Sequence, residues 1–305
     1  MERHTSSTHD SRRGLVGIIS ERFLKLRTSR VARRALRNSL LLTGMGLFTF
    51  VFLLGVFADF LAITPYDEVQ MRHRFEPPSA AFPFGTDNFG RDIFSRVVYG
   101  ARISLQIGLS VVVLSGILGV IFGTLAGYFP RLDNVIMRVM DALLAFPEII
   151  LAIAIAATLG PSTANAIIAL AVVYTPRTAR VVRASVLVIR QMDYVTAAIC
   201  AGATDMRILR RHVFPNTLAP LVVQLTFIFA YAVIAEAVLS FLGIGAVPPT
   251  PTWGNIIAEG RNYIREATWI SLFPGLAIGI TVLGLNLLGD GLRDVLDPRM
   301  KVRHG

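Results

Sequence analysis

Two carboxylates, Glu148 and Glu236, stand inside long apolar stretches of this 305-residue chain. A charged group at membrane depth is costly and usually faces a helix-bundle interior or an aqueous cavity, where it can contact a solute or carry a proton. We therefore take Glu236, Glu148 and Asn286 as candidates for lining a translocation pathway. The alternative is structural. Glu236 would then hydrogen-bond a neighbouring helix, with Asn286 or Gln224 as partner, and Glu148 would extend its carboxylate to the membrane surface.

Other chemistry is poorly represented in the sequence. A phosphate-cradling ATP site needs a lysine after glycine, but the two lysines, Lys25 and Lys301, follow leucine and methionine. The five histidines are scattered without metal-ligand spacing, and Cys200 is the single cysteine, so neither a metal site nor an internal disulfide is predicted. The sequence shows no nucleophile–base pair that would make it an intramembrane enzyme. We predict no catalytic residue and no bound cofactor.

A small polar cluster opens a helical pattern in residues 64–102. It consists of Gly85, Thr86, Asp87, Gly90, Arg91 and Asp92. Metal or phosphate binding is one interpretation of the cluster, and mutual neutralisation of its Asp and Arg side chains is the favoured one. Apolar residues at 89, 93, 97 and 101 then recur at helical spacing. This spacing predicts an amphipathic helix that lies on the membrane surface.

Composition assigns the chain to the all-α polytopic membrane proteins. Hydrophobic residues make up 53% of it and charged residues 16%, with a mean hydropathy of +0.60. The net charge of +10 is concentrated at the N-terminus, where residues 1–39 hold ten Lys or Arg and three acids. A basic segment directly before an apolar span is a topology signal that also contacts anionic lipid. Nucleic acid is therefore not a predicted partner.

The hydropathy pattern predicts six transmembrane helices with both termini in the cytoplasm. The expected divisions are a basic tail (1–39), a first span (40–63), an extracytoplasmic loop (64–102), a five-helix core (103–290) with a cytoplasmic loop at 177–216, and a C-terminal tail (291–305). Residues 142–176 fit either one long helix or a hairpin of two spans broken at Gly160. The hairpin is favoured because it puts the arginine-rich 177–216 loop on the same side as the basic tail. Gly116, Gly119, Gly123 and Gly127 predict close helix packing in the second span.

Residues 193–216 form a polar segment between two apolar regions, and we interpret them as a docking elbow. A short helix is expected to end at Gly202 in a left-handed conformation. A second helix is expected to start at Thr204 or Asp205 and to end at Pro215, with Met206, Leu209 and Val213 on one face. Small side chains would let the backbone of another protein approach closely. The residues predicted to serve docking are Ala197, Ala198, Gly202, Ala203, Asp205 and Pro215.

This elbow resembles the cytoplasmic Glu-Ala-Ala loop of permease subunits in ABC importers. Ala197, Ala198, Gly202 and Pro215 match that pattern, and Thr196 stands where the pattern has glutamate. The stretch FGTDNFGRDIFSRVVYGARISL closely resembles C-type permease subunits of dipeptide and oligopeptide ABC importers, as do PPTPTWG at 248–254 and the ending NLLGDGLRDVLDPRMK. The likeness covers residues 40–301.

The resemblance implies a type I importer permease of the inner membrane that works by alternating access. Its expected partners are a second homologous permease subunit, two cytoplasmic ATPases that bind the ATP, and an extracytoplasmic solute-binding protein. The alternatives are an importer of nickel, glutathione or another small solute, and a proton-coupled secondary transporter with Glu148 and Glu236 as proton sites.

Trp253, in the outer loop, is expected at the membrane interface.

Overall fold

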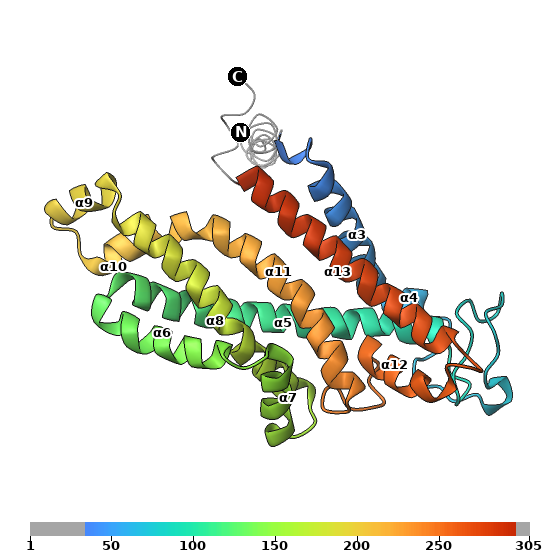
Figure 1. Ribbon diagram of the computed structural model, residues 1–305. Coiled ribbons are helices and arrows are strands. Elements are labelled where there is room, and N and C mark those ends of the chain that lie inside the picture. Colours follow the sequence, from blue (N-terminus) through green and yellow to red (C-terminus); the bar gives the residue numbers. More distant parts are fainter. Residues whose placement is uncertain (1–33, 297–305) are drawn as a thin grey trace, which may run out of the picture.

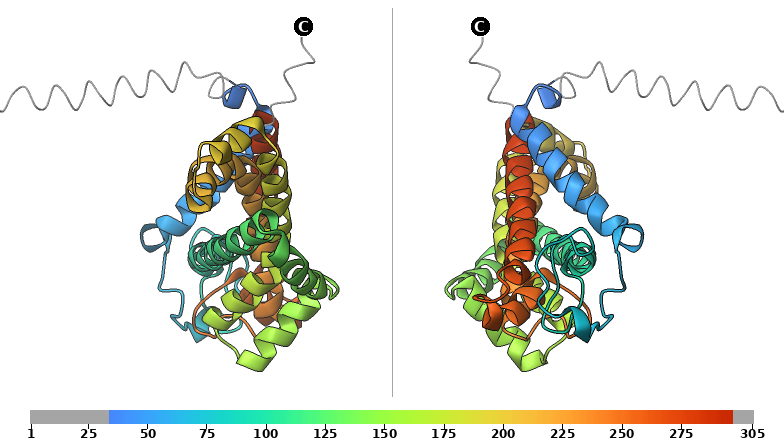
Figure 2. Two further views of the ribbon diagram at one scale, coloured as in Figure 1. Left: turned by 90° about the vertical axis from the view of Figure 1, so that its left-hand side faces the viewer. Right: turned by 90° about the vertical axis from the view of Figure 1, so that its right-hand side faces the viewer.

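The computed structural model describes residues 34–296, and its regular elements there are all helices (Figure 1). The helices of 12 residues or more are α3 (Ser39–Val56), α5 (Ile93–Tyr128), α6 (Pro130–Leu144), α7 (Glu148–Leu159), α8 (Thr163–Arg190), α11 (Phe214–Phe241) and α13 (Trp269–Leu296). Shorter ones are α4 (Ala58–Leu61), α9 (Asp193–Cys200), α10 (Asp205–Ile208), a π-helical turn at Leu209–Val213, α12 (Trp253–Gly260) and 3-10 turns at Met71–His73 and Arg261–Tyr263. In Figure 1, α9 and α10 lie at one end of the molecule, and α12 lies toward the other. Figure 2 shows α3 running beside α13, against which it packs.

Four of these helical segments are long and apolar enough to cross a membrane: α3, α5, α13 and the continuous segment Asp205–Phe241. Helices α6 and α7 are bent by 92° relative to each other and count as a fifth only if the pair is one span. Helix α7 alone has 12 residues, roughly 18 Å of helix against a hydrocarbon core of about 30 Å. Helix α8 is long enough, but its second half carries Arg177, Arg180 and Arg183. The fold is that of an all-α polytopic membrane protein, and the count of six spans stays a prediction.

Helices α5 and α8 approach closely along the glycine row of α5. A β-carbon added at Gly119 would meet the side chain of Thr178, and one added at Gly127 would meet Val186. Gly123 lies in the same way against Val182. Small residues at a spacing of four allow helix backbones to approach in membranes. The packing role predicted for these glycines is confirmed.

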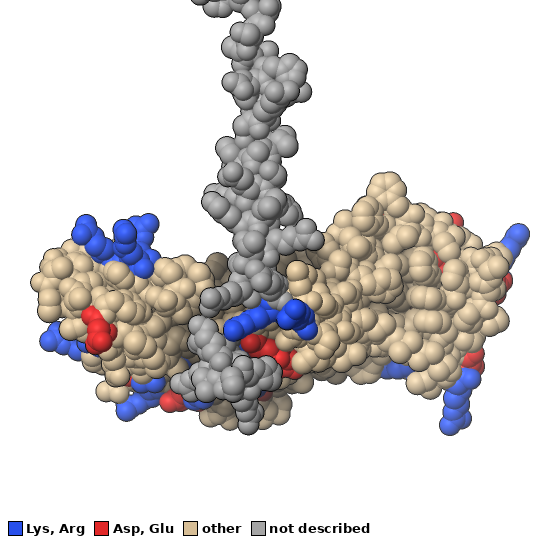
Figure 3. Space-filling view, turned by 90° about the horizontal axis from the view of Figure 1, so that it is seen from above, with Lys and Arg blue, Asp and Glu red and all other residues tan. Residues whose placement is uncertain are grey.

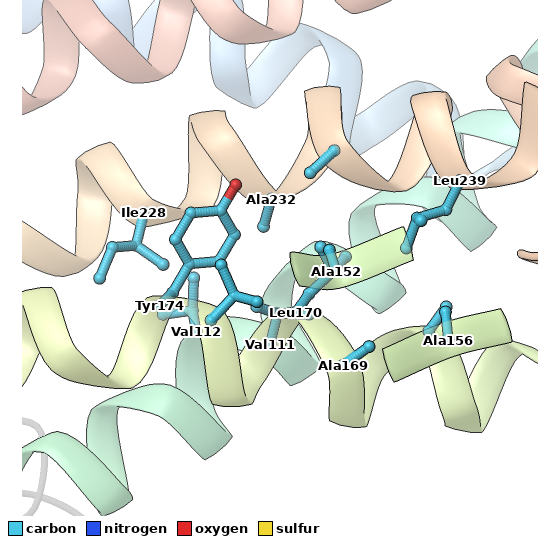
Figure 4. Close-up of a cluster of buried hydrophobic side chains, with 13 residues drawn as sticks. Val111, Val112, Ala152, Ala156, Ala169, Leu170, Tyr174, Ile228, Ala232 and Leu239 are labelled. Carbon is cyan, nitrogen blue, oxygen red and sulfur yellow. The ribbon is translucent and has the colours of Figure 1, made fainter. Parts of the chain in front are cut away.

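The main core lies between α5, α7, α8 and α11 (Figure 4). Its buried members include the alanines Ala152 and Ala156 of α7 and Ala169 of α8, together with the larger Leu170 and Tyr174. Close contact through alanines holds α7 against α8. Helix α7 by itself is too short to span a bilayer. The Tyr174 hydroxyl donates to the backbone carbonyl of Tyr231 in α11 at 3.3 Å.

The helix predicted near residues 89–101 exists, but it does not lie on the surface. It forms the first turns of α5, where Asp92 caps the helix by accepting from the backbone N–H groups of Phe94 and Ser95. Ile93 and Val97 are buried in a cluster with Ile256 of α12. The apolar face that indicated a membrane-surface helix is therefore covered by a segment about 150 residues further along the chain.

Trp253 also differs from its predicted position at the membrane interface. It is 0% exposed, and its indole N–H donates to the Val97 carbonyl of α5 at 3.0 Å. Gly100 lies against the same ring, so closely that an added β-carbon would be 3.0 Å from it. The tryptophan therefore fixes α12 to α5 within the protein core.

Several boundaries differ from those expected. The non-helical part of the predicted 177–216 loop is short, because α8 continues to Arg190 and α11 begins at Phe214. Helix α13 continues to Leu296, into the predicted C-terminal tail. The predicted first span corresponds to α3 with α4 after it. Residues 1–33 of the basic tail and residues 297–305 lie outside the described residues.

Candidate functional site

The elbow between α8 and α11 has the local conformation expected of it. Helix α9 ends at Cys200, and Gly202 follows with a φ of +78°. The backbone N–H of Ala203 donates to the Ala198 carbonyl, and that of Gly202 to the Ile199 carbonyl. This is the hydrogen-bond pattern of a helix that ends in a left-handed glycine. Thr204 then precedes α10 as its N-cap residue.

Only part of the small-residue stretch of the elbow is exposed, since Ala198 and Ala203 are half-buried against an apolar cluster. Ala197, Gly202 and Cys200 are exposed, and a β-carbon added at Gly202 would have no described atom within 4 Å. Apolar side chains surround them, because Ile199 is 53% and Met206 64% exposed. An exposed surface of small and apolar side chains has the composition of a protein docking site. Its role in docking stays a prediction.

The buried face of the second elbow helix is as predicted for Leu209 and Val213 but not for Met206. Ile208 and Val213 are each 1% exposed, whereas Met206, predicted to face the same way, points outward. Pro215 does not end this helix either. A π-helical turn at Leu209–Val213 joins α10 to α11, and Pro215 falls in the first turn of α11, directly after that turn.

A hydrogen bond and a buried apolar cluster, neither of which the sequence revealed, fix the elbow to the long helices. The Tyr128 hydroxyl, at the end of α5, donates to the carboxylate of Asp205 at 2.7 Å. The Arg190 guanidinium, at the end of α8, lies 5.7 Å from the centre of the Tyr128 ring. Below them, Val195 and Ile208 pack into a buried cluster with Tyr128. The elbow therefore packs directly against the ends of α5 and α8.

Glu236 is an interhelical hydrogen-bond acceptor. It is 0% exposed, and its carboxylate accepts from the Ser240 hydroxyl at 2.7 Å and from the Ser104 hydroxyl of α5 at 3.1 Å. These serines take the place of the expected partners Asn286 and Gln224. Asn286 is half-buried on α13, and Gln224 faces a cavity instead. The contacts favour the structural interpretation of Glu236 over a place in the pathway.

Exchanging Glu236 separates its charge from its hydrogen bonds. We expect Glu236→Gln to keep the thermal unfolding midpoint close to that of the parent, because an amide can still bond both serines. We expect Glu236→Leu to lose about 1–3 kcal/mol, since it leaves buried hydroxyls without their acceptor. Thermal unfolding of the purified chain in detergent measures both. A stable Glu236→Gln chain that supports no transport would instead show that the charge itself is required.

A polar groove runs along α8 and α11. Two cavities, of about 690 Å³ and 630 Å³, share Val181, Gln224 and Phe227 as lining residues. Glu148 and Arg177 form an ion pair of 2.5 Å in the wall of the larger cavity. Of the three pathway candidates, Glu148 thus lies in this groove, whereas Glu236 and Asn286 line neither cavity.

At the end of the molecule opposite the elbow, two acids and two arginines form a largely buried network of ion pairs. Asp87, 0% exposed, accepts from Arg91 at 2.6 Å and from Arg96 at 2.8 Å. Glu259 of α12 accepts from the same two arginines, at 2.5 Å and 2.7 Å. Burial raises the pKa of Glu259, but the two guanidinium groups outweigh it and hold that pKa below its ordinary value. Mutual neutralisation, the favoured interpretation of the Gly85–Asp92 cluster, is confirmed for Asp87 and Arg91, whereas Asp92 caps α5 instead.

Metal binding finds no support in the described residues. Among residues 34–296 no three His, Cys, Asp or Glu side chains are grouped as metal ligands.

On the face seen in Figure 3, the charged side chains gather toward the two ends and in one cluster between them, and uncharged surface separates these groups. Such a distribution suits a protein whose ends are in water and whose middle is in lipid.

Comparison with known proteins agrees with this arrangement. Residues 115–302 match the family described as binding-protein-dependent transport system inner membrane component, and residues 27–78 match the N-terminal TM domain of oligopeptide transport permease C. A Brucella suis biovar 1 protein named as a peptide transport system permease is 56% identical over 271 residues, which are 89% of this chain and 92% of that protein. The dipeptide transport system permease protein DppC of Alkalihalophilus pseudofirmus is 47% identical, over 87% of this chain and 88% of its own.

A further relative and one solved structure complete the comparison. The glutathione transport system permease protein GsiD of Pectobacterium atrosepticum is 46% identical, over 74% of this chain and 75% of its own. A chain of the MetNI methionine ABC transporter in an inward-facing conformation superposes with a TM-score of 0.53 at 22% identity, covering 65% of this chain and 95% of that one. That likeness shows a shared fold, the type I ABC importer permease fold. The chain belongs to the family of binding-protein-dependent transport system inner membrane components.

Proposed function

We propose that this chain is the permease subunit of an ABC importer that carries peptides across the inner membrane. The observation that supports it most is its 56% identity, over nearly the whole length, to a protein named as a peptide transport system permease. A second homologous permease subunit would enclose the pathway, two cytoplasmic ATPases would bind and hydrolyse ATP, and an extracytoplasmic binding protein would deliver the solute. The chain itself would be no enzyme and hold no cofactor, in keeping with its lack of a phosphate-binding lysine after glycine.

The elbow is the proposed contact with the ATPases. Its exposed small residues, centred on Gly202, present a surface that a partner backbone can approach. The hydrogen bond from Tyr128 to Asp205 and the packing of Ile208 would carry the movement of the ATPases into α5 and α11. Alternating access then follows from reorientation of these helices around the groove.

Reconstitution tests the proposal. The complete complex in liposomes, with its binding protein outside and ATP inside, should accumulate di- and tripeptides. Peptide uptake that proceeds without ATP, or uptake by the purified chain alone in a pH gradient, would contradict it and favour a proton-coupled carrier. Glutathione is the alternative solute that a relative supports. Uptake of glutathione or Ni²⁺ but not of peptides would replace the peptide assignment and leave the importer assignment intact.

Topology gives a further prediction. With six spans and both termini in the cytoplasm, alkaline phosphatase fused after Ser79 or after Pro161 should be active outside, and phosphatase fused after Gly202 should be inactive. The fusion after Pro161 is decisive, because it separates the α6–α7 segment from α8. An inactive fusion at that point would overturn the hairpin of two spans and with it the count of six.

A further inference from the structure

Three ion pairs follow one another between α8 and the segment α6–α7. Arg183 bonds Asp133 at 2.6 Å, Arg180 bonds Asp141 at 2.6 Å, and Arg177 bonds Glu148 at 2.5 Å. The arginines are spaced by three residues on α8, so they lie on one face of that helix. The acids are supplied by two helices that are bent by 92° relative to each other. The row of pairs therefore runs from the α6–α8 contact to the start of α7.

The pairs differ in what they face. Glu148, Arg177 and Arg180 line the 690 Å³ cavity, together with Gln224 and Tyr231. The Arg177 guanidinium lies 5.3 Å from the centre of the Tyr231 ring. Asp133 and Arg183, which form the most regular pair with two bonds of 2.6 Å, line neither of the two groove cavities. One pair is thus accessible from the groove, and another pair of the same kind on the same helix is not.

This arrangement suits a solute that carries both charges. A peptide with free ends has an ammonium group at one end, a carboxylate at the other, and amide groups between. Glu148 offers an acceptor for the ammonium, the Arg177 and Arg180 guanidinium groups offer donors for the carboxylate, and the Gln224 amide can bond the peptide backbone. The cavity volume lies within the range of pockets that enclose small ligands.

We propose that the Glu148–Arg177 pair is a contact site for the charged ends of a peptide in the groove. Without solute the two side chains neutralise each other, so this pair presents no net charge to the groove. With solute, the pair opens and each member takes the opposite charge of the peptide, and one ion pair is exchanged for two. This inference rests on the proposed function, since it concerns the solute of the importer.

A purely structural role is the competing explanation. Burial of an arginine and an acid within a membrane helix bundle also requires that they be paired, and Asp133–Arg183 serves that purpose without facing the groove. The two explanations differ in one respect. Only a contact site distinguishes a peptide with free ends from one whose ends are capped and uncharged.

The experiment measures access to the groove directly and without the binding protein. In a Cys200→Ala chain, Val181→Cys places the only thiol of this subunit between the two cavities, with little change in side-chain volume. The complete complex is assembled in nanodiscs without ATP, and the rate of maleimide labelling at position 181 is followed. The probes are trialanine and the same tripeptide with an acetylated N-terminus and an amidated C-terminus.

Trialanine should slow labelling in a saturable way, and the capped tripeptide should require a roughly tenfold or higher concentration, since it lacks the charge-assisted bonds. The double variant Glu148→Gln/Arg177→Gln should remove this difference. The matched double variant Asp133→Asn/Arg183→Gln should keep it. Equal protection by both peptides, no protection by either, or the same loss in both double variants would overturn the proposal.

The comparison of the two peptides needs no variant at the pair, so the proposal stays testable even if the Glu148→Gln/Arg177→Gln complex fails to assemble. Failure of the proposed function is recognised separately. ATP-driven uptake of trialanine by the unaltered complex in liposomes tests whether peptides are transported at all. Uptake together with equal protection by both peptides would reject only the contact site.

Discussion

Gly202→Arg should abolish transport and leave the chain folded in the membrane. The glycine has a φ of +78°, and no described atom lies within 4 Å of the position of an added β-carbon. An arginine side chain at this position would therefore start from open space at the exposed surface of the elbow, where we place the ATPase partner, and would hold that partner away. Co-purification of the ATPase subunits with a tagged chain, and peptide uptake by the complex, measure the effect.

Gly202→Ala is the matched control. A single L-residue in the left-handed region costs about 1 kcal/mol, and alanine adds only a methyl group. We expect this variant to keep ATPase attachment and most of the uptake, with a small fall in the thermal unfolding midpoint. Normal uptake by Gly202→Arg would count against the docking role of the elbow. Equal loss in both variants would show that backbone strain, and not obstruction, is the cause.

Arg96→Leu should cause a large loss of stability. The Arg96 side chain is 1% exposed and bonds both Asp87 and Glu259. Its removal would leave two buried carboxylates with a single arginine, and breaking a buried ion pair in this way costs about 3–5 kcal/mol. Arg102→Leu is the control on the same helix. Arg102 pairs with Asp59, whose side chain is 61% exposed, so we expect the loss of that ion pair to cost far less than the loss of Arg96.

The pH dependence of unfolding tests the predicted role of Arg96 in a second way. The folded-state pKa of Glu259 is lowered, so its stabilisation is fully present above the ordinary glutamate pKa and is lost as the pH falls through the lowered value. Without Arg96 that lowering should shrink. The stability that is lost between the ordinary glutamate pKa and the lowered one should then be smaller in Arg96→Leu than in the parent. Arg102→Leu should keep that Glu259-dependent loss, since Arg102 pairs with Asp59 and not with Glu259. Identical acid profiles for Arg96→Leu and the parent would contradict the assignment of Arg96 as the main partner of Glu259.

Features that depend on neighbouring residues could be predicted from the sequence. The left-handed Gly202 follows from a glycine at the end of a short helix. The glycine row of α5 follows from a spacing of four, because it needs only a neighbouring helix and not a particular one. Within the Gly85–Asp92 cluster, Asp87 and Arg91 neutralise each other because they are four positions apart.

Features that depend on distant residues could not be predicted. Glu259 joins Arg96 across 163 positions of the chain, and no pattern near either residue indicates the other. The apolar face of Val97 has the spacing of a membrane-surface helix, and only the position of Trp253 shows that it is buried. The position of α8 in the bundle could not be predicted for a related reason. Its arginines lower its hydropathy, and the acids that neutralise them lie on other helices.

Hydrogen bonds at both ends connect α5 to the segment Asp205–Phe241. Tyr128 holds Asp205 at one end, and Ser104 holds Glu236 at the other. The two attachments are roughly 36 Å apart along α5. Two stiff helical segments that are joined at two separated points resist sliding past each other, and they bend little when a force acts on one of them. A force applied at the elbow should therefore turn α5 and α11 together as one rigid body, and the displacement should reach the far end of the bundle almost undiminished.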